Sequence, residues 1–177
     1  MKKLTALMLG LCAAISTMSA QAQTSPERDA KLYARPELVI AFPGDFDNAV
    51  GGGLALGYSI AKAHAVEVEA IYFSSKDGYT TVKFMPVVGS YIYSLRLDPR
   101  FSLKVGASIG ATYEKADYYW AHENTSAFTF GARAGLAYTL AKNVSLDLDV
   151  SALRLNETSI TTSGNIVLTT LGVNFRF

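Results

Sequence analysis

The sequence predicts an all-β fold, an eight-stranded antiparallel up-and-down transmembrane β-barrel. Two observations carry this prediction. After residue 30, apolar and polar residues alternate with period two in eight successive segments, which is typical of strands with two chemically different faces. The connections between these segments alternate between tight turns and longer polar loops, as they do in up-and-down membrane barrels. An even number of strands then places both ends of the barrel sequence on the same side.

The segments that we assign to strands can be given by residue range. They are 32–42, 50–61, 66–73, 80–93, 101–114, 127–140, 144–152 and 165–177. The fifth is the clearest, because every second residue from Phe101 to Tyr113 is apolar and the residues between them are small or polar. We expect tight turns at 62–65, 94–100 and 141–143, and longer connections at 43–49, 75–79, 116–126 and 156–163.

Residues 1–22 have the features of a secretory signal peptide. Lys2 and Lys3 provide a positive start, residues 4–17 are apolar, and the tripeptide at 20–22 is a small-x-small cleavage pattern. We expect cleavage after Ala22, a short polar lead over residues 23–30 and one barrel domain over residues 31–177. The apolar stretch is too short for a membrane-spanning helix, which takes roughly 20 apolar residues, and no later segment supplies one.

Composition excludes several classes of function. Cys12, the single cysteine, lies inside the expected signal, so the exported part can form no disulfide, thiol nucleophile or cysteine metal site. Without Lys2 and Lys3, the 16 basic residues fall to 14 against 15 acidic residues, a formal charge of −1. Such a balance does not attract nucleic acid. We expect no cofactor and no metal.

The charged residues of the strands occupy the polar register, and we expect them to face the lumen. Buried charges are tolerable only when they are paired, so we predict an ion-pair network that closes the lumen, with a narrow ion path as the alternative. The predicted network consists of Arg35, Glu37, Glu67, Glu69, Lys83, Lys104, Glu114, Arg133, Asp147, Asp149 and Arg176. Glycines in the same register suit the crowded interior of an eight-stranded barrel. They are Gly53, Gly57, Gly89, Gly106, Gly110, Gly131, Gly135 and Gly172.

A secreted ligand carrier with its apolar face inward would also alternate with period two. The aromatic residues of the apolar register favour lipid outside, because they gather near the strand ends as the two boundary belts of a membrane barrel do. The expected upper belt contains Phe42, Tyr72, Phe84, Tyr113, Phe128 and Phe130, and the lower belt contains Tyr58, Phe101, Tyr138, Phe175 and Phe177. Detergent dependence distinguishes the two alternatives, because a secreted carrier would stay monodisperse without detergent and a membrane barrel would not.

The end of the sequence resembles the C-terminal assembly signal of bacterial outer-membrane barrels. The residues that carry this resemblance are Gly172, Val173, Phe175 and Phe177. With the signal peptide and seven preceding strands, the chain from Lys31 resembles the small outer-membrane β-barrel families typified by the OmpA transmembrane domain and OmpX. The resemblance implies location in the bacterial outer membrane, contact with lipid and lipopolysaccharide, and insertion by the barrel-assembly machinery. We expect a monomer without the wall-binding domain of full OmpA-type proteins.

Two functions remain after this reasoning. The favoured function is a structural or surface-interaction role, and the alternative is a small-solute channel. Tyr118, Tyr119 and Trp120, in the third outside loop, are candidates for contact with a partner or for anchoring against lipopolysaccharide.

Catalysis is the least favoured option. Lipid A-modifying enzymes of this architecture use a histidine with a serine and an acid on the outer upper rim. His122 has Glu123 and Ser126 nearby, but we place all three on one loop without the His-x-Ser spacing on a strand, and His64 lies in a turn. We therefore expect no catalytic residue.

Overall fold

The chain folds into one closed antiparallel barrel of eight strands, as predicted. The computed structural model describes residues 32–44, 47–77, 80–117, 122–156 and 164–177. Its strands are β1 (Leu32–Pro43), β2 (Ala49–Ala61), β3 (His64–Asp77), β4 (Thr80–Arg96), β5 (Phe101–Asp117), β6 (His122–Ala141), β7 (Val144–Leu155) and β8 (Asn165–Arg176). In the described ranges, no helix is long and apolar enough to cross a membrane. The expected signal and the polar lead lie outside these ranges.

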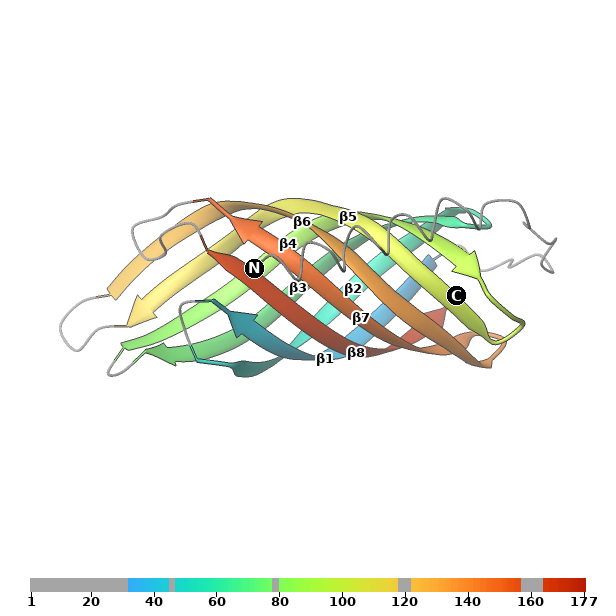
Figure 1. Cartoon of the computed structure of the whole chain (residues 1–177), viewed down its shortest axis with the longest axis horizontal. Helices are drawn as coiled ribbons and strands as arrows, with labels where there is room; N and C mark the ends of the chain where they lie inside the picture. Colours follow the sequence, from blue (N-terminus) through green and yellow to red (C-terminus); the bar gives the residue numbers. More distant parts are fainter. Residues whose placement is uncertain (1–31, 45–46, 78–79, 118–121, 157–163) are drawn as a thin grey trace, which may run out of the picture.

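Each strand pairs with its neighbours in sequence, and β8 pairs with β1 to close the sheet (Figure 1). The backbone N–H of Phe177 donates to the carbonyl of Leu32 at 2.9 Å, which continues this seam to the last residue. The tight connections β2–β3, β4–β5 and β6–β7 lie at one end, here called the turn end, and the opposite strand ends define the loop end, at the left of Figure 1. Closure leaves no strand edge without a partner.

The β4–β5 turn is held by a side chain. Oδ1 of Asp98 accepts hydrogen bonds from the backbone N–H groups of Arg100, at 2.6 Å, and Phe101, at 2.8 Å. These two bonds hold the pKa of the exposed Asp98 carboxyl below its usual value, because they stabilise the ionised form.

The strands at the loop end are longer than the sequence predicted. β5 continues to Asp117 and β6 begins at His122, and their pairing continues through Asp117 opposite His122. Residues 122–126 were assigned to a loop, and this was wrong: His122, Glu123 and Ser126 belong to β6. The polar composition of this segment misled the prediction, because a hairpin that extends past the sheet's apolar region can be polar on both faces.

The sequence analysis was wrong about which residues of β4 face the lumen. Its even-numbered residues point inward: Phe84 is 1% exposed, and Val82, Val88 and Ile92 are also buried. The predicted lumen residues Lys83 and Gly89 therefore lie on the outward register, and Phe84 does not belong to the aromatic belt. Lys83 stands opposite Ser74 and Lys115, which are both exposed. Both faces of β4 are largely apolar, so its alternation alone did not distinguish inside from outside.

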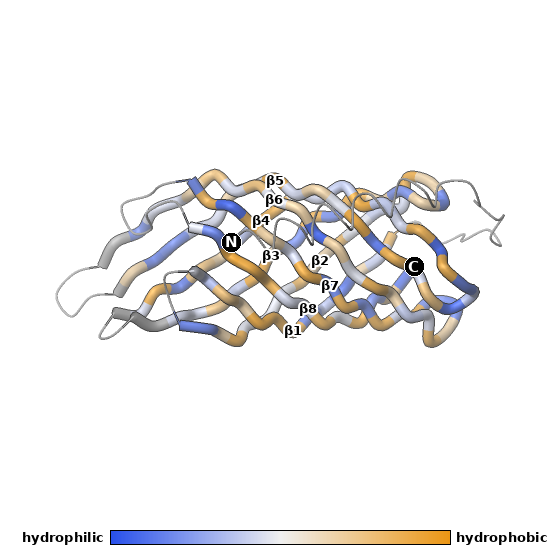
Figure 2. Tube along the Cα trace, viewed as in Figure 1, coloured by the Kyte–Doolittle hydropathy of each residue, from blue (hydrophilic) through white to orange (hydrophobic). Residues whose placement is uncertain are grey.

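The outer surface is a band of exposed apolar side chains. Figure 2 shows hydrophobic and hydrophilic residues alternating along the strands, and the large hydrophobic residues of the outward register are exposed. All the other predicted belt residues of the upper group are exposed, namely Phe42, Tyr72, Tyr113, Phe128 and Phe130. A barrel with this surface requires an apolar environment, because a soluble protein rarely exposes so much contiguous apolar area.

Candidate functional site

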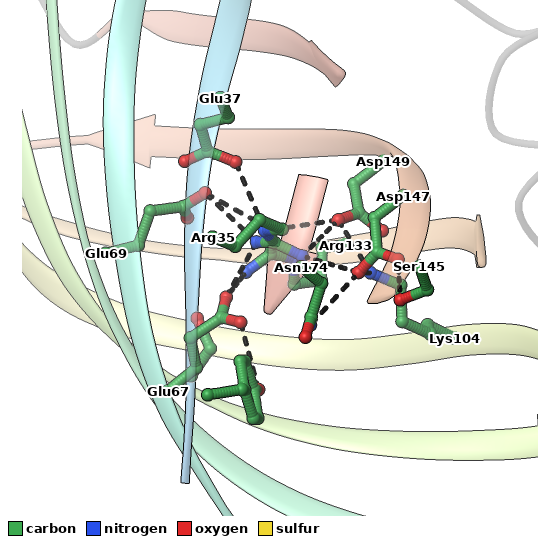
Figure 3. A network of polar contacts seen from close by, with 12 residues as sticks. Arg35, Glu37, Glu67, Glu69, Lys104, Arg133, Ser145, Asp147, Asp149 and Asn174 are labelled. Atoms are coloured by element: carbon green, nitrogen blue, oxygen red, sulfur yellow. Dashed lines mark hydrogen bonds and ion pairs between the residues drawn. The ribbon is translucent and has the colours of Figure 1, made fainter. Parts of the chain in front are cut away.

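The lumen near the turn end contains a cluster of buried ion pairs, with Arg35 of β1 at its centre (Figure 3). Its guanidinium Nη1 lies 2.7 Å from Oδ2 of Asp149, and its Nη2 lies 2.9 Å from Oε1 of Glu67. Three further carboxylates, those of Glu37, Glu69 and Asp147, lie between 3.4 and 3.6 Å from the same guanidinium. Arg35 therefore connects β1 to carboxylates of β3 and β7 across the barrel interior.

Two more basic residues complete this group. Arg133 of β6 bonds Glu67 at 2.6 Å and contacts Glu69 at 3.3 Å, and Lys104 of β5 lies 2.9 Å from both Asp147 and Asp149. We call the eight residues the charged cluster: Arg35, Glu37, Glu67, Glu69, Lys104, Arg133, Asp147 and Asp149. Buried ion pairs are tolerable when opposite charges lie close together, and each charge of this cluster lies within 3.6 Å of an opposite one.

Glycines make room for these long side chains. A Cβ on Gly172 would lie 2.7 Å from Cγ of Arg35, and a Cβ on Gly57 would collide with the ring of Tyr33, whose hydroxyl donates to Glu67 at 3.0 Å. A Cβ on Gly135 would collide with the Asp149 carboxylate. The glycines of the inward register are thus part of the charged cluster's geometry.

The other predicted network residues lie elsewhere. Glu114 is buried on the inward face but nearer the loop end, level with Phe84. Arg176 is half-buried at the turn end, where its Nη2 donates to Oγ of Ser145 at 3.3 Å. Lys83, as described above, is on the outside.

A second group of residues fills the lumen near the loop end, and the sequence analysis missed it. The rings of Phe73 and Phe84 stack there with centroids 5.1 Å apart and an interplanar angle of 17°. We call this group the apolar cluster: Val39, Ala41, Ala49, Ile71, Phe73, Val82, Phe84, Ala116, Ala127, Leu153, Leu155, Ile166 and Leu168. A signal was present in the sequence, since Ile71, Phe73, Leu153 and Leu155 are apolar residues in a register that is otherwise polar.

A cavity of about 270 Å³ opens at the turn end below the charged cluster. Arg35, Glu67, Lys104 and Asp147 belong to its lining, together with residues of the turns such as Lys62. The lumen therefore has three regions in sequence from the turn end: an open cavity, the charged cluster and the apolar cluster.

The remaining predicted residues have the following positions. Phe175 and Phe177 point outward and are exposed at the turn end, and Gly172 and Val173 lie on β8 where it pairs with β1 and β7. Ser126 is exposed on β6. Tyr118, Tyr119 and Trp120 lie outside the described residues. Among the described residues, no group of histidine, cysteine and acidic side chains is arranged to hold a metal ion.

A closed barrel with an apolar exterior and charged side chains inside is the geometry of a protein that crosses a membrane with strands. The sequence model of the outer membrane protein beta-barrel domain matches residues 10–177, almost the whole chain. The chain belongs to this family. It is therefore a bacterial outer-membrane protein, and its apolar surface faces the lipid of that membrane. Since short turns are periplasmic in such barrels, the turn end faces the periplasm and the loop end faces outward.

Solved structures of outer-membrane barrels share this fold. Neisserial surface protein A is similar at a TM-score of 0.76, with 16% identity over 82% of this chain and 97% of that chain. Ail, the attachment invasion locus protein of Yersinia pestis, has a TM-score of 0.57 and 14% identity, over 84% of this chain and 97% of that one. OprG from Pseudomonas aeruginosa has a TM-score of 0.56 and 14% identity, over 84% and 96%. At these identities the likeness shows the fold alone. No curated protein sequence matches significantly.

Proposed function

We propose that this outer-membrane barrel has a structural or surface-interaction role and that its lumen is closed to solutes. The observation that carries the proposal is the occupation of the lumen at two levels, by the charged cluster and by the apolar cluster. The interior of an eight-stranded barrel is just wide enough for its side chains to fill, so two layers of side chains support a lumen without a continuous water path.

The apolar cluster is the stronger barrier of the two. An ion that passed between Phe73 and Phe84 would lose its hydration without gaining a charged or polar ligand from those side chains. The charged cluster adds a second barrier, because its carboxylates are held within hydrogen-bond distance of Arg35, Lys104 and Arg133.

Conductance measurements test the closed lumen. We expect the purified chain, reconstituted in planar bilayers, to leave conductance at background, with an outer-membrane porin in the same bilayers as the positive control. Reproducible single-channel steps above background would contradict the proposal and favour the alternative, a small-solute channel.

The surface-interaction role depends on the four outward connections. Tyr118, Tyr119 and Trp120 are the proposed contact residues, since aromatic residues are frequent anchors of protein interfaces. Deleting the connections one at a time, with adhesion, serum resistance and permeability as readouts, would locate such a role. Wild-type behaviour of all four deletions would contradict a surface-interaction role and leave the structural one.

The C-terminal residues are proposed to act as the assembly signal read by the barrel-assembly machinery. Removing Phe177 takes away an exposed ring and one backbone bond to Leu32. We expect the truncated chain to refold in detergent but to assemble poorly in cells. Poor refolding in detergent as well would assign Phe177 to barrel closure instead. We propose that the barrel is a monomer, which light scattering in detergent can check.

We also propose that the barrel is not an enzyme. If it modified lipid A, an overproducing strain would contain lipid A of altered mass. The Ser126→Ala variant serves as the control, because Ser126 is the exposed serine near His122 in sequence. Altered lipid A with the wild-type chain and normal lipid A with the variant would contradict the proposal.

A further inference from the structure

The cavity at the periplasmic end is lined by more basic than acidic residues. Its arginine and lysine lining residues are Arg35, Lys62, Arg96, Lys104 and Arg176, and its acidic ones are Glu67 and Asp147. Its volume of about 270 Å³ corresponds to roughly nine water molecules at the volume each occupies in the liquid. A small solute with a charged group therefore fits within it.

Both acidic residues of the lining already have basic partners. Glu67 accepts hydrogen bonds from Arg35 at 2.9 Å, from Arg133 at 2.6 Å and from the hydroxyl of Tyr33 at 3.0 Å. Asp147 accepts a bond from Lys104 at 2.9 Å and one from Ser145 at 3.0 Å. These carboxylates are committed to the charged cluster, so they offer little to a cation that enters from the periplasm.

Two arginines of the lining, in contrast, bond neutral acceptors. Arg176 donates to the hydroxyl of Ser145 at 3.3 Å, and its Nη1 is buried without a hydrogen-bond partner in the described structure. Arg96 donates to the backbone carbonyls of Asp98, at 3.0 Å, and Pro99, at 2.9 Å. Within the described residues, neither guanidinium forms an ion pair with a carboxylate side chain. The positive charge of these two side chains is thus not neutralised by a direct ion pair.

We propose that this cavity is a binding site for a phosphate group that enters from the periplasmic side. Arg176 is its main ligand, and Lys104 keeps one of its three donors for the anion, because two are used by Asp147 and Asp149. Arg96 and Lys62 supply positive charge at the turns. Guanidinium groups favour phosphate because their donors form a planar fork that matches two phosphate oxygens.

Titration of the full chain with inorganic phosphate, in an uncharged maltoside detergent, tests the proposal by calorimetry. We expect saturable binding that weakens with added salt, and about tenfold weaker binding by the Arg176→Gln variant, which loses a charge-assisted contact. The matched control is Arg154→Gln, which removes an exposed arginine on the outward face of β7 near the loop end. It should bind phosphate like the wild type.

Two results would overturn the site. One is the absence of saturable binding up to roughly 10 mM phosphate, which would mean that the basic lining only balances the surplus carboxylates of the charged cluster. The other is equal affinity of the wild type and the Arg176→Gln variant. If that variant does not fold, the Lys62→Gln and Arg96→Gln double variant, changed only in and beside exposed turns, provides the same comparison.

The source of the phosphate is distinguished by a second arm of the experiment, with the chain in phosphatidylglycerol nanodiscs. Phosphate binding that persists there assigns the site to a soluble phosphate compound. Binding that is seen in maltoside but is blocked in the nanodiscs assigns it to a lipid headgroup of the inner leaflet.

Discussion

Two regions of the lumen are occupied by side chains of opposite chemistry. Near the periplasmic end, eight charged side chains from five strands are held by mutual ion pairs, with Arg35 and Arg133 almost fully buried. Near the outer end, the apolar cluster fills the same cylinder with side chains such as Phe73, Phe84 and Leu168. The stability of the charged cluster depends on the pairing of opposite charges, and the stability of the apolar cluster depends on how completely side chains fill the space.

This difference predicts how each region fails. A charge left alone in a dry interior is costly, so the charged cluster should be sensitive to the loss of any one shared partner. The apolar cluster should respond in proportion to the space left empty, since its side chains are held by packing and not by ion pairs. The following experiments test this contrast, beginning with the largest expected effect.

Removing Arg35 should have one of the two largest effects on the stability of the barrel. The Arg35→Met variant keeps a long apolar stem but leaves five carboxylates without their common partner, and we expect a loss of about 3 to 5 kcal/mol in the free energy of unfolding. Urea unfolding in detergent measures it. The exposed Arg154→Met variant, as control, should change stability by about 0.5 kcal/mol or less. A similar small change for both variants would show that the ion pairs are energetically neutral.

Truncation in the apolar cluster should have an effect in the same range. We expect Phe84→Ala to cost about 3 to 5 kcal/mol, because it leaves a cavity beside Phe73, and Phe84→Leu to cost clearly less, because leucine refills most of the space. The same unfolding assay applies. Nearly equal losses for the two variants would indicate that Phe84 acts through something other than volume.

The outer surface differs from both clusters, because its side chains contact lipid instead of other protein side chains. Ala107 of β5 is exposed and stands opposite Tyr91 and Ala132. We expect Ala107→Leu to be tolerated and Ala107→Arg to cost about 2 to 4 kcal/mol if it lies near the bilayer midplane. Heat-resistant folding on semi-native gels compares them. Equal folding of both variants would contradict the assignment of this face to lipid.

The facing of β4 can be tested by chemical labelling. In a background without Cys12, the Lys83→Cys variant should react with a water-soluble thiol reagent applied to whole cells, because residue 83 lies on the outward register near the loop end. The Phe84→Cys variant should be protected inside the apolar cluster. Labelling of the Phe84→Cys variant and protection of the Lys83→Cys variant would show that Lys83 faces the lumen, as the sequence analysis predicted.

The smallest effect is expected in the β4–β5 turn. Because the pKa of Asp98 is lowered in the folded barrel, its contribution is present above the unfolded pKa of about 3.9 and is lost as pH falls through the folded value. Comparing the wild type with Asp98→Ala, we expect a stability difference at pH 7 that shrinks below about pH 4. A difference independent of pH would assign the role of Asp98 to turn geometry alone.

Much of the fold could be predicted because alternation is a local property. Arg35 and Glu37 on β1, and Asp147 and Asp149 on β7, alternate with apolar residues, so the sequence alone shows that the two charges of each strand share a face. β4 lacked this contrast, since both of its faces are apolar and its one charge within the predicted strand, Lys83, lies near the loop end. There the outward face leaves the hydrocarbon, and the rule that charges point inward no longer applies.

The apolar cluster was missed for a related reason. Period two identifies two faces but assigns one character to each face along the whole strand. β3 shows the limitation: Glu67 and Glu69 are followed on the same face by Ile71 and Phe73. The change from charged to apolar occurs at the same height on several strands, and it becomes visible only when the strands are aligned side by side.

The sequence by itself determined the number of strands, the all-β class and the up-and-down order of this protein, because these depend on residues close together in the chain. The tertiary structure decided which charges meet and where the lumen is filled. Arg35 and Asp149 are 114 residues apart in sequence and 2.7 Å apart in the barrel. Closure of β8 onto β1 sets such distances, since it fixes the stagger of all eight strands at once.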